Sequence, residues 1–236
     1  MSVAPVEPEI DCMLERGAEA APTVHPAVVE NIVCSITGSL RPARRLPPRW
    51  ARWATLFVGC GAVAFVGAAA AGFGGLAALG PWRGAAILTT LALLGAAVAH
   101  EVLARSIPGS RVHLNALPML AGCCASLVFV YALMLHDYGS HEFVAAGLGC
   151  LEQGILHAIP AGLLGMILLR RGFAARPLSA ALAGGALAAL AGIGFLEMHC
   201  PNLEAAHRIV WHTAVLPLSA VLVGLGALIA GYNRGA

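Results

Sequence analysis

Two cysteines lie near the ends of long apolar stretches of this chain. Cys150 lies inside the stretch at 144–169, and Cys200 closely follows the stretch at 178–198. Thiols on the oxidising side of a membrane can form a redox pair. They are also ligands for soft metal ions, particularly beside histidines. A cysteine within a helix can instead be a small apolar filler. The residue types leave these three interpretations open for the pair.

The loop around the second cysteine contains further ligand types. His199, His207 and His212 offer imidazole nitrogens, and thiolate with imidazole is a donor set for Zn²⁺ and softer metals. Their spacing matches no standard zinc motif, so an ordinary turn at the membrane surface remains the alternative. Glu152 and His157 are further candidate co-ligands, because ionisable residues within a span usually face the bundle interior and mark a function. Their alternatives are an interfacial carboxylate and a hydrogen bond between helices.

The composition identifies the class of protein that must position these side chains. The 236 residues are 59% hydrophobic and 11% charged, with a mean hydropathy of +0.81. A soluble chain is roughly 45–50% apolar and about 25% charged, so a soluble or disordered protein is excluded. The sequence contains neither a Ser–His–acid arrangement nor a Gly-rich phosphate loop ahead of a basic residue. We therefore expect a membrane protein that is not an enzyme and has no cofactor beyond transient heavy-metal binding.

Six stretches are long and apolar enough to cross a bilayer core of about 30 Å, which needs roughly 20 helical residues. They run over 51–76, 84–103, 113–135, 144–169, 178–198 and 209–230. The sequence therefore predicts an all-α bundle of six transmembrane helices over residues 51–233. The abundant Gly, Ala and Ser let such helices approach closely.

The arginines predict the orientation of the bundle. All 14 basic residues are Arg, and only Arg83 and Arg208 fall outside the segments on one side of the membrane. Short Arg-rich loops stay in the cytoplasm. We therefore expect a multi-pass protein of the bacterial inner membrane with both termini in the cytoplasm. Cys150 and Cys200 then share one depth at the outer face.

Residues 1–50 form the predicted cytoplasmic segment. Residues 1–25 are acidic and rich in Pro and Ala, which is typical of disorder. Residues 26–40 are predicted to form an amphipathic helix, because apolar residues recur at spacings of three and four. No basic residue lies on its polar face, which favours a protein partner over a lipid surface. The apolar face contains the candidate partner-binding residues Val29, Ile32, Val33, Ile36 and Leu40.

The helix is followed by an Arg-rich run. Arg41, Arg44, Arg45 and Arg49 precede the first span, where arginines suit the anionic head groups of the lipid bilayer. Pro42, Pro47 and Pro48 interrupt any continuous helix there.

Three groups of residues resemble one known family. The first is the run Leu40-Arg-Pro-Ala-Arg-Arg-Leu-Pro-Pro-Arg-Trp50. The second is Cys150 with Pro160, followed by Leu168-Leu-Arg-Arg-Gly172. The third is His199-Cys-Pro201 with His207 and Trp211-His212. Together with six spans, they resemble the NrsF-type membrane anti-sigma factors over roughly residues 27–233.

The resemblance implies a regulatory function. Such a protein would hold an extracytoplasmic-function sigma factor inactive at the membrane, bind no nucleic acid, and release its partner on a heavy-metal or oxidative signal. The family's two functional cysteines map onto Cys150 and Cys200. Two other classes remain open on the residues alone: a membrane thiol oxidoreductase that uses a quinone, and a small transporter for a metal or proton.

Overall fold

The computed structural model describes residues 25–39, 47–107, 110–112, 114–139, 143–169 and 177–232. The chain divides into two compact units, residues 1–45 and residues 46–236. The predictions for residues 1–24 lie outside the described residues. So do those for Leu40, Arg41, Arg44 and Arg45.

In the first unit the described structure is one helix, α2 (Pro26–Ser39). It covers the segment in which the apolar residues recur at helical spacing. Proline is well tolerated in the first turn of a helix, where its missing N–H costs no hydrogen bond. The apolar side chains Val29, Ile32, Val33 and Ile36 are each 48–53% exposed. Such a helix has an apolar face that a partner could cover.

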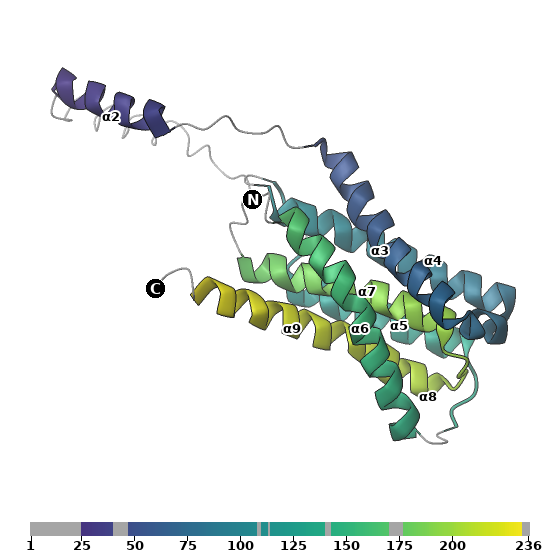
Figure 1. The fold of residues 1–236 in the computed structure, drawn as a ribbon. Helices are drawn as coiled ribbons and strands as arrows, with labels where there is room; N and C mark the ends of the chain where they lie inside the picture. The colour runs from purple at the N-terminus through teal and green to yellow at the C-terminus, as the bar shows by residue number, and fades with distance from the viewer. Residues whose placement is uncertain are drawn as a thin grey trace, which may run out of the picture. The chain divides into compact units, whose positions relative to one another are not determined.

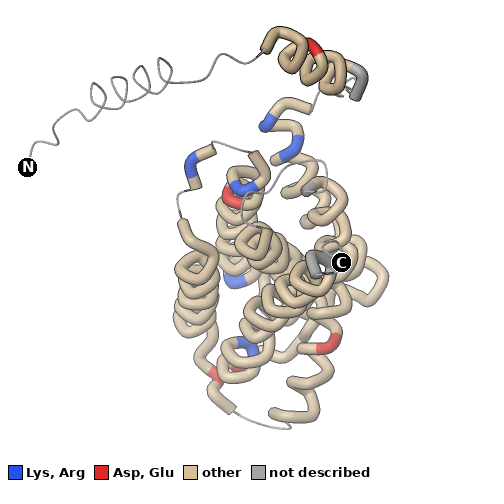
Figure 2. Tube along the Cα trace, turned by 90° about the vertical axis from the view of Figure 1, so that its left-hand side faces the viewer, with Lys and Arg blue, Asp and Glu red and all other residues tan. Residues whose placement is uncertain are grey.

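The second unit is a bundle of helices (Figure 1). Its first five long helices are α3 (Arg49–Ala71), α4 (Gly74–Arg105), α5 (Ala116–Met134), α6 (Phe143–Leu169) and α7 (Pro177–His199). The sixth apolar span consists of α8 (Ala205–His207), the π-helix η1 (Arg208–His212) and α9 (Thr213–Tyr232). Six helical spans are long and apolar enough to cross a membrane. The predicted all-helical bundle is therefore confirmed, and Figure 2 shows that charged residues are sparse along it.

The first two spans differ from the predicted bounds. Helix α3 ends at Ala71 instead of continuing to residue 76, because Gly72 adopts φ 101°. Helix α4 begins at Gly74, ten residues earlier than predicted, and contains Arg83, which we expected in a loop. A kink at Gly80, with φ 72°, and Pro81 joins its two helical parts. The backbone at Gly80 is not helical, so the Gly-Pro pair separates a short helical part at 74–79 from the long part that contains Arg83.

Helix α7 is the centre of the bundle and contacts α3, α4, α5, α6 and α9. Small residues make this possible, because they let neighbouring backbones approach. A Cβ added at Gly192 would overlap the carbonyl oxygen of Gly154 on α6. A Cβ added at Gly185 would lie 2.7 Å from Cα of Ala220 on α9. Helices α6, α7 and α9 therefore pack with their backbones close together.

The N-terminal end of α7 is tied to α4 by a buried arginine. Nε of Arg105 donates to Oγ of Ser179 at 3.1 Å, and its Nη1 pairs with the carboxylate of Glu101 at 2.9 Å. A further guanidinium nitrogen donates to the carbonyl oxygen of Leu114. Helices α4 and α7 and the segment before α5 therefore meet at this end of the bundle, and the opposite end of α7 holds the candidate site.

Candidate functional site

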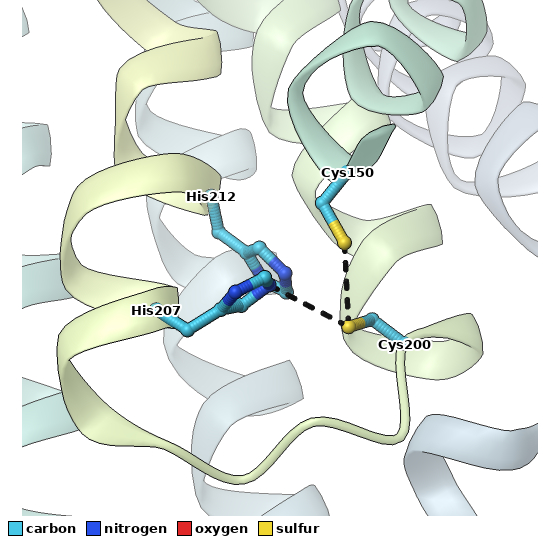
Figure 3. A group of neighbouring side chains, drawn as sticks. All are labelled: Cys150, Cys200, His207 and His212. Carbon is cyan, nitrogen blue, oxygen red and sulfur yellow. Dashed lines mark hydrogen bonds between the residues drawn. The ribbon is translucent and has the colours of Figure 1, made fainter. Parts of the chain in front are cut away.

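Four side chains from three spans converge beside the C-terminal end of α7. Cys150 comes from α6, Cys200 follows α7, and His207 and His212 come from the last span (Figure 3). One ligand atom from each lies within 4.8 Å of the other three. The two sulfurs are 3.5 Å apart, and Sγ of Cys200 lies 3.8 Å from Nε2 of His207. Cys200 and both histidines are buried, and Cys150 is half-buried. We call these four residues the thiol–imidazole cluster.

The π-helix η1 brings the two histidines to one side of the last span. In a regular α-helix, residues five apart lie about 140° apart around the axis. In η1 the Thr213 N–H instead bonds the carbonyl of Arg208, five residues earlier. Residues separated by five then lie close to one face, as His207 and His212 do. Single π-turns of this kind are frequent at functional sites.

A buried carboxylate lies behind the cluster. Glu197 on α7 forms an ion pair with Arg208 and accepts a hydrogen bond from Oη of Tyr131 at 2.8 Å. Nδ1 of His212 lies 2.6 Å from the same carboxylate oxygen, Oε1. The side chains of Glu197, Arg208 and His212 are all 0% exposed. The carboxylate therefore connects α5, α7 and η1.

The same arginine also fixes the turn that carries Cys200. Nη2 of Arg208 donates to the carbonyl oxygen of Cys200 at 3.0 Å, and its Nε donates to the carbonyl of Asn202 at 2.8 Å. On the other side, a Cβ added at Gly75 would lie 2.8 Å from the Cys200 carbonyl oxygen. Contacts from Arg208 and from Gly75 of α4 to the Cys200 carbonyl therefore fix the backbone from which the Cys200 side chain extends.

The pKa of Cys200, which lies between two spans, is lowered. The thiol of Cys150 donates a hydrogen bond to its sulfur, and His207 and His212 also favour the thiolate. These interactions outweigh burial, which acts in the opposite direction. The thiolate is the form that binds metals and attacks oxidants, so the surroundings of Cys200 favour its reactive form.

The other three candidate co-ligands lie outside the cluster. His199 bonds the Gly72 carbonyl through Nδ1 at 3.1 Å, and its ring stacks on Phe195. His157 also stacks on Phe195, with ring centroids 3.5 Å apart. Glu152 is exposed. Two of the three therefore pack around one aromatic ring.

Arg49, expected at the lipid surface, is exposed at the start of α3. Its Nη2 lies 3.2 Å from Nε2 of His100 on α4. The arginine therefore also connects the first two spans near the end of the bundle opposite the thiol–imidazole cluster.

Reasoning from the sequence did not single out Glu197, Arg208 and Tyr131. A signal was present, since Glu197 is the one charged residue in the stretch 178–198 and Arg208 precedes the next stretch. Acids and bases within spans usually pair with each other. Tyr131 had no such signal, because a tyrosine in an apolar span is also an ordinary packing residue.

The cluster has the chemistry of a metal site. Two thiols and two imidazoles are a tetrahedral ligand set for Zn²⁺ and for softer ions. Two thiolates bound to one tetrahedral ion at about 2.3 Å are about 3.8 Å apart. The observed 3.5 Å between the sulfurs is close to that value. The same pair could also be joined by oxidation after a shift that brings the sulfurs to bonding distance.

The fold and this cluster define a class: a helical bundle with six membrane-type spans and a buried thiol–imidazole cluster near one end of its central helix. A comparison with protein families adds the identity. Residues 36–232 match the model of NrsF, described as "Negative regulator of sigma F". The chain belongs to this family and is a negative regulator of a sigma factor, which is not an enzyme class. Searches of the curated proteins and of the solved structures found no match.

The family match begins inside α2. Only the last residues of this helix, from Ile36, belong to the matched range, and residues 26–35 precede it. The resemblance in the sequence motifs extended to about residue 27. The family match therefore does not cover most of α2, and any role of its exposed face rests on the residues of this chain alone.

Proposed function

We propose that this protein is an anti-sigma factor of the bacterial inner membrane. It holds an extracytoplasmic-function sigma factor and releases it when a heavy-metal ion or an oxidant acts on Cys150 and Cys200. Both termini lie in the cytoplasm, and the thiol–imidazole cluster lies near the outer face. The bilayer and the sigma factor are its partners.

The observation that carries this proposal is the convergence of four donors within 4.8 Å of one another. Cys150 lies 50 residues before Cys200, whereas the two histidines closely follow Cys200, so α6 must pack against the last two spans for the four donors to meet. Ions such as Zn²⁺ and Cd²⁺ suit the two sulfurs and two nitrogens. An oxidant would instead join the sulfurs in a disulfide and accept the two electrons that the thiols lose.

The position of the cluster explains how a signal could change the bundle. Bound metal would link α6 to the C-terminal end of α7 and to the last span. Because α7 contacts five other helices, a shift at that end requires movement against most of the bundle. A ligand can bias such a switch only through different affinities for the two states. The metal-bound state is therefore the one with the lower affinity for the sigma factor.

The exposed apolar face of α2 supports a protein partner. Its polar face contains Glu30, Asn31 and Ser35 and no basic residue, unlike most helices that lie on anionic membranes. A partner groove could cover the valine and isoleucine side chains, as in other helix-in-groove complexes. We assign the sigma factor to this face.

Changing Ile32 and Ile36 to Asp is expected to abolish sigma binding. Each substitution would place a charge inside an apolar groove, where burial without a partner is costly. The measurement is co-purification of the full-length protein in detergent with the sigma factors of the same genome. The expected loss of affinity is at least about 100-fold, or roughly 2.7 kcal/mol.

The matched control changes Asn31 and Ser35 to Asp, with the same charge and the same four-residue spacing on the polar face. It should retain the sigma factor. Equal binding by both double variants would exclude the apolar face of α2 as the contact. Failure of the unmodified protein to bind any sigma factor would reject the proposed function itself.

A further inference from the structure

We propose that Glu197 is a positioning residue that makes Nε2 the metal-binding nitrogen of His212. The inference rests on the proposed metal-binding role of the cluster and adds a residue to it. The carboxylate does not itself belong to the four converging donors. It acts through the hydrogen bond between its Oε1 and Nδ1 of His212, which is 2.6 Å long.

The hydrogen bonds of the carboxylate determine which histidine nitrogen carries a proton. Glu197 is paired with the Arg208 guanidinium through Oε2, and Tyr131 donates to Oε1. A carboxylate in this arrangement can only accept, so Nδ1 of His212 must be the donor. The lone pair of a neutral His212 is then on Nε2. This nitrogen is buried and makes no hydrogen bond to any described residue.

His207 provides an internal contrast. Its Nε2 lies 3.8 Å from Sγ of Cys200, but its buried Nδ1 makes no hydrogen bond to a described residue. No carboxylate therefore fixes the tautomer or the ring orientation of His207. Histidines that bind metals usually donate their other ring N–H to a carboxylate or carbonyl, which orients the ring and raises its basicity. Only His212 has that support here.

Replacing Glu197 by Gln should reverse the tautomer. The guanidinium of Arg208 needs an acceptor, so the amide oxygen must take the place of Oε2. The amide NH₂ then faces Nδ1 of His212, which has to become the acceptor. The proton moves to Nε2, and that nitrogen can no longer bind a metal. The variant changes the shape of the side chain very little, but it also removes the counter-charge of the buried Arg208 guanidinium, so its stability is measured beside its metal affinity.

The first test uses the unmodified full-length protein, labelled with ¹⁵N-histidine and loaded with ¹¹³Cd²⁺ in detergent. We expect ¹¹³Cd–¹⁵N coupling to Nε2 of His212 and a protonated Nδ1, with the signal assigned by its loss in His212→Gln. Coupling through Nδ1, or cadmium bound by the two cysteines without His212, would overturn the inference. This measurement does not depend on whether a Glu197 variant folds.

The second test compares Glu197→Gln with Tyr131→Phe. Loss of an outer partner of a ligand typically lowers metal affinity 10–100-fold. We expect a decrease of that size for Glu197→Gln, with the cadmium–thiolate absorption retained and the His212 coupling lost. Tyr131→Phe removes another bond to the same Oε1 and should change the affinity by less than about 3-fold, because the carboxylate still accepts from His212.

The outcomes separate the two proposals. Unchanged affinity and unchanged His212 coupling in a folded Glu197→Gln protein would reject the positioning role and leave the metal site standing. Absence of cadmium binding in the unmodified protein would reject the metal-sensing proposal, and the positioning role with it. A merely structural role would lower stability in both variants without changing which nitrogen of His212 binds the ion.

Discussion

Changing Cys150 and Cys200 together to Ser is expected to abolish release of the sigma factor by Cd²⁺ while leaving the sigma factor bound. The two sulfurs supply half of the converging donors, and serine hydroxyls are poor ligands for soft metals. The affinity for Cd²⁺ should fall by more than about 100-fold, the upper end of the effect of losing an outer partner alone. The measurement is transcription from a sigma-dependent reporter across a Cd²⁺ series.

Cys60 and Cys123 provide the matched control. Both are buried in the spans α3 and α5, and neither belongs to the thiol–imidazole cluster. Changing these two to Ser should leave the Cd²⁺ response in place. A normal response in the Cys150/Cys200 variant would remove the sensing role of the pair. Constitutive release from that variant would instead mean that the two thiols are required to hold the sigma factor.

The second large effect is expected at the crossing of α6 and α7. A Cβ at Gly192 would overlap the backbone oxygen of Gly154, which lies one helical turn from Cys150. Gly192→Ala should therefore push the two helices apart and separate the sulfurs. Overpacking of this kind costs about 1–3 kcal/mol. We expect lower thermal stability in detergent together with weaker Cd²⁺ binding.

Gly194→Ala is the control for that substitution. It lies on the same helix two residues away, and its new Cβ would meet only Cβ of Ala64, at 3.5 Å. This distance is an ordinary contact, so stability and Cd²⁺ affinity should be retained. If Gly192→Ala matched Gly194→Ala in both measurements, the close approach of α6 and α7 would not control the distance between the sulfurs.

The bundle could be predicted from the sequence because length and apolar composition suffice to recognise membrane-type spans. Six such helices are present, but the second one begins earlier than predicted. The charge of Arg83 and the Gly80-Pro81 pair are typical of a loop in a hydropathy pattern. The Gly-Pro pair does interrupt the helix, because Gly80 adopts a non-helical φ of 72°, whereas Arg83 lies within the long helical part that follows.

The site could be predicted only in part. Cys150 and Cys200 could be predicted as a pair because the start of the fourth span and the end of the fifth face the same side of the membrane. This follows from the order of the spans alone. The choice among histidines could not be made, because a helical pattern with 100° per residue separates His207 from His212. The π-turn that aligns them lies where Arg208 and His212 contact Glu197 on α7. Those contacts involve residues on two spans, which no local pattern reveals.

The central claim is that metal binding at the thiol–imidazole cluster releases the sigma factor. The most direct test adds Cd²⁺ in substoichiometric steps to the purified full-length complex in lipid nanodiscs. Cadmium–thiolate absorption and sigma dissociation are followed in the same sample. We predict that the two signals rise together and saturate near one Cd²⁺ per chain. Saturation of the thiolate signal with the sigma factor still fully bound would contradict the account.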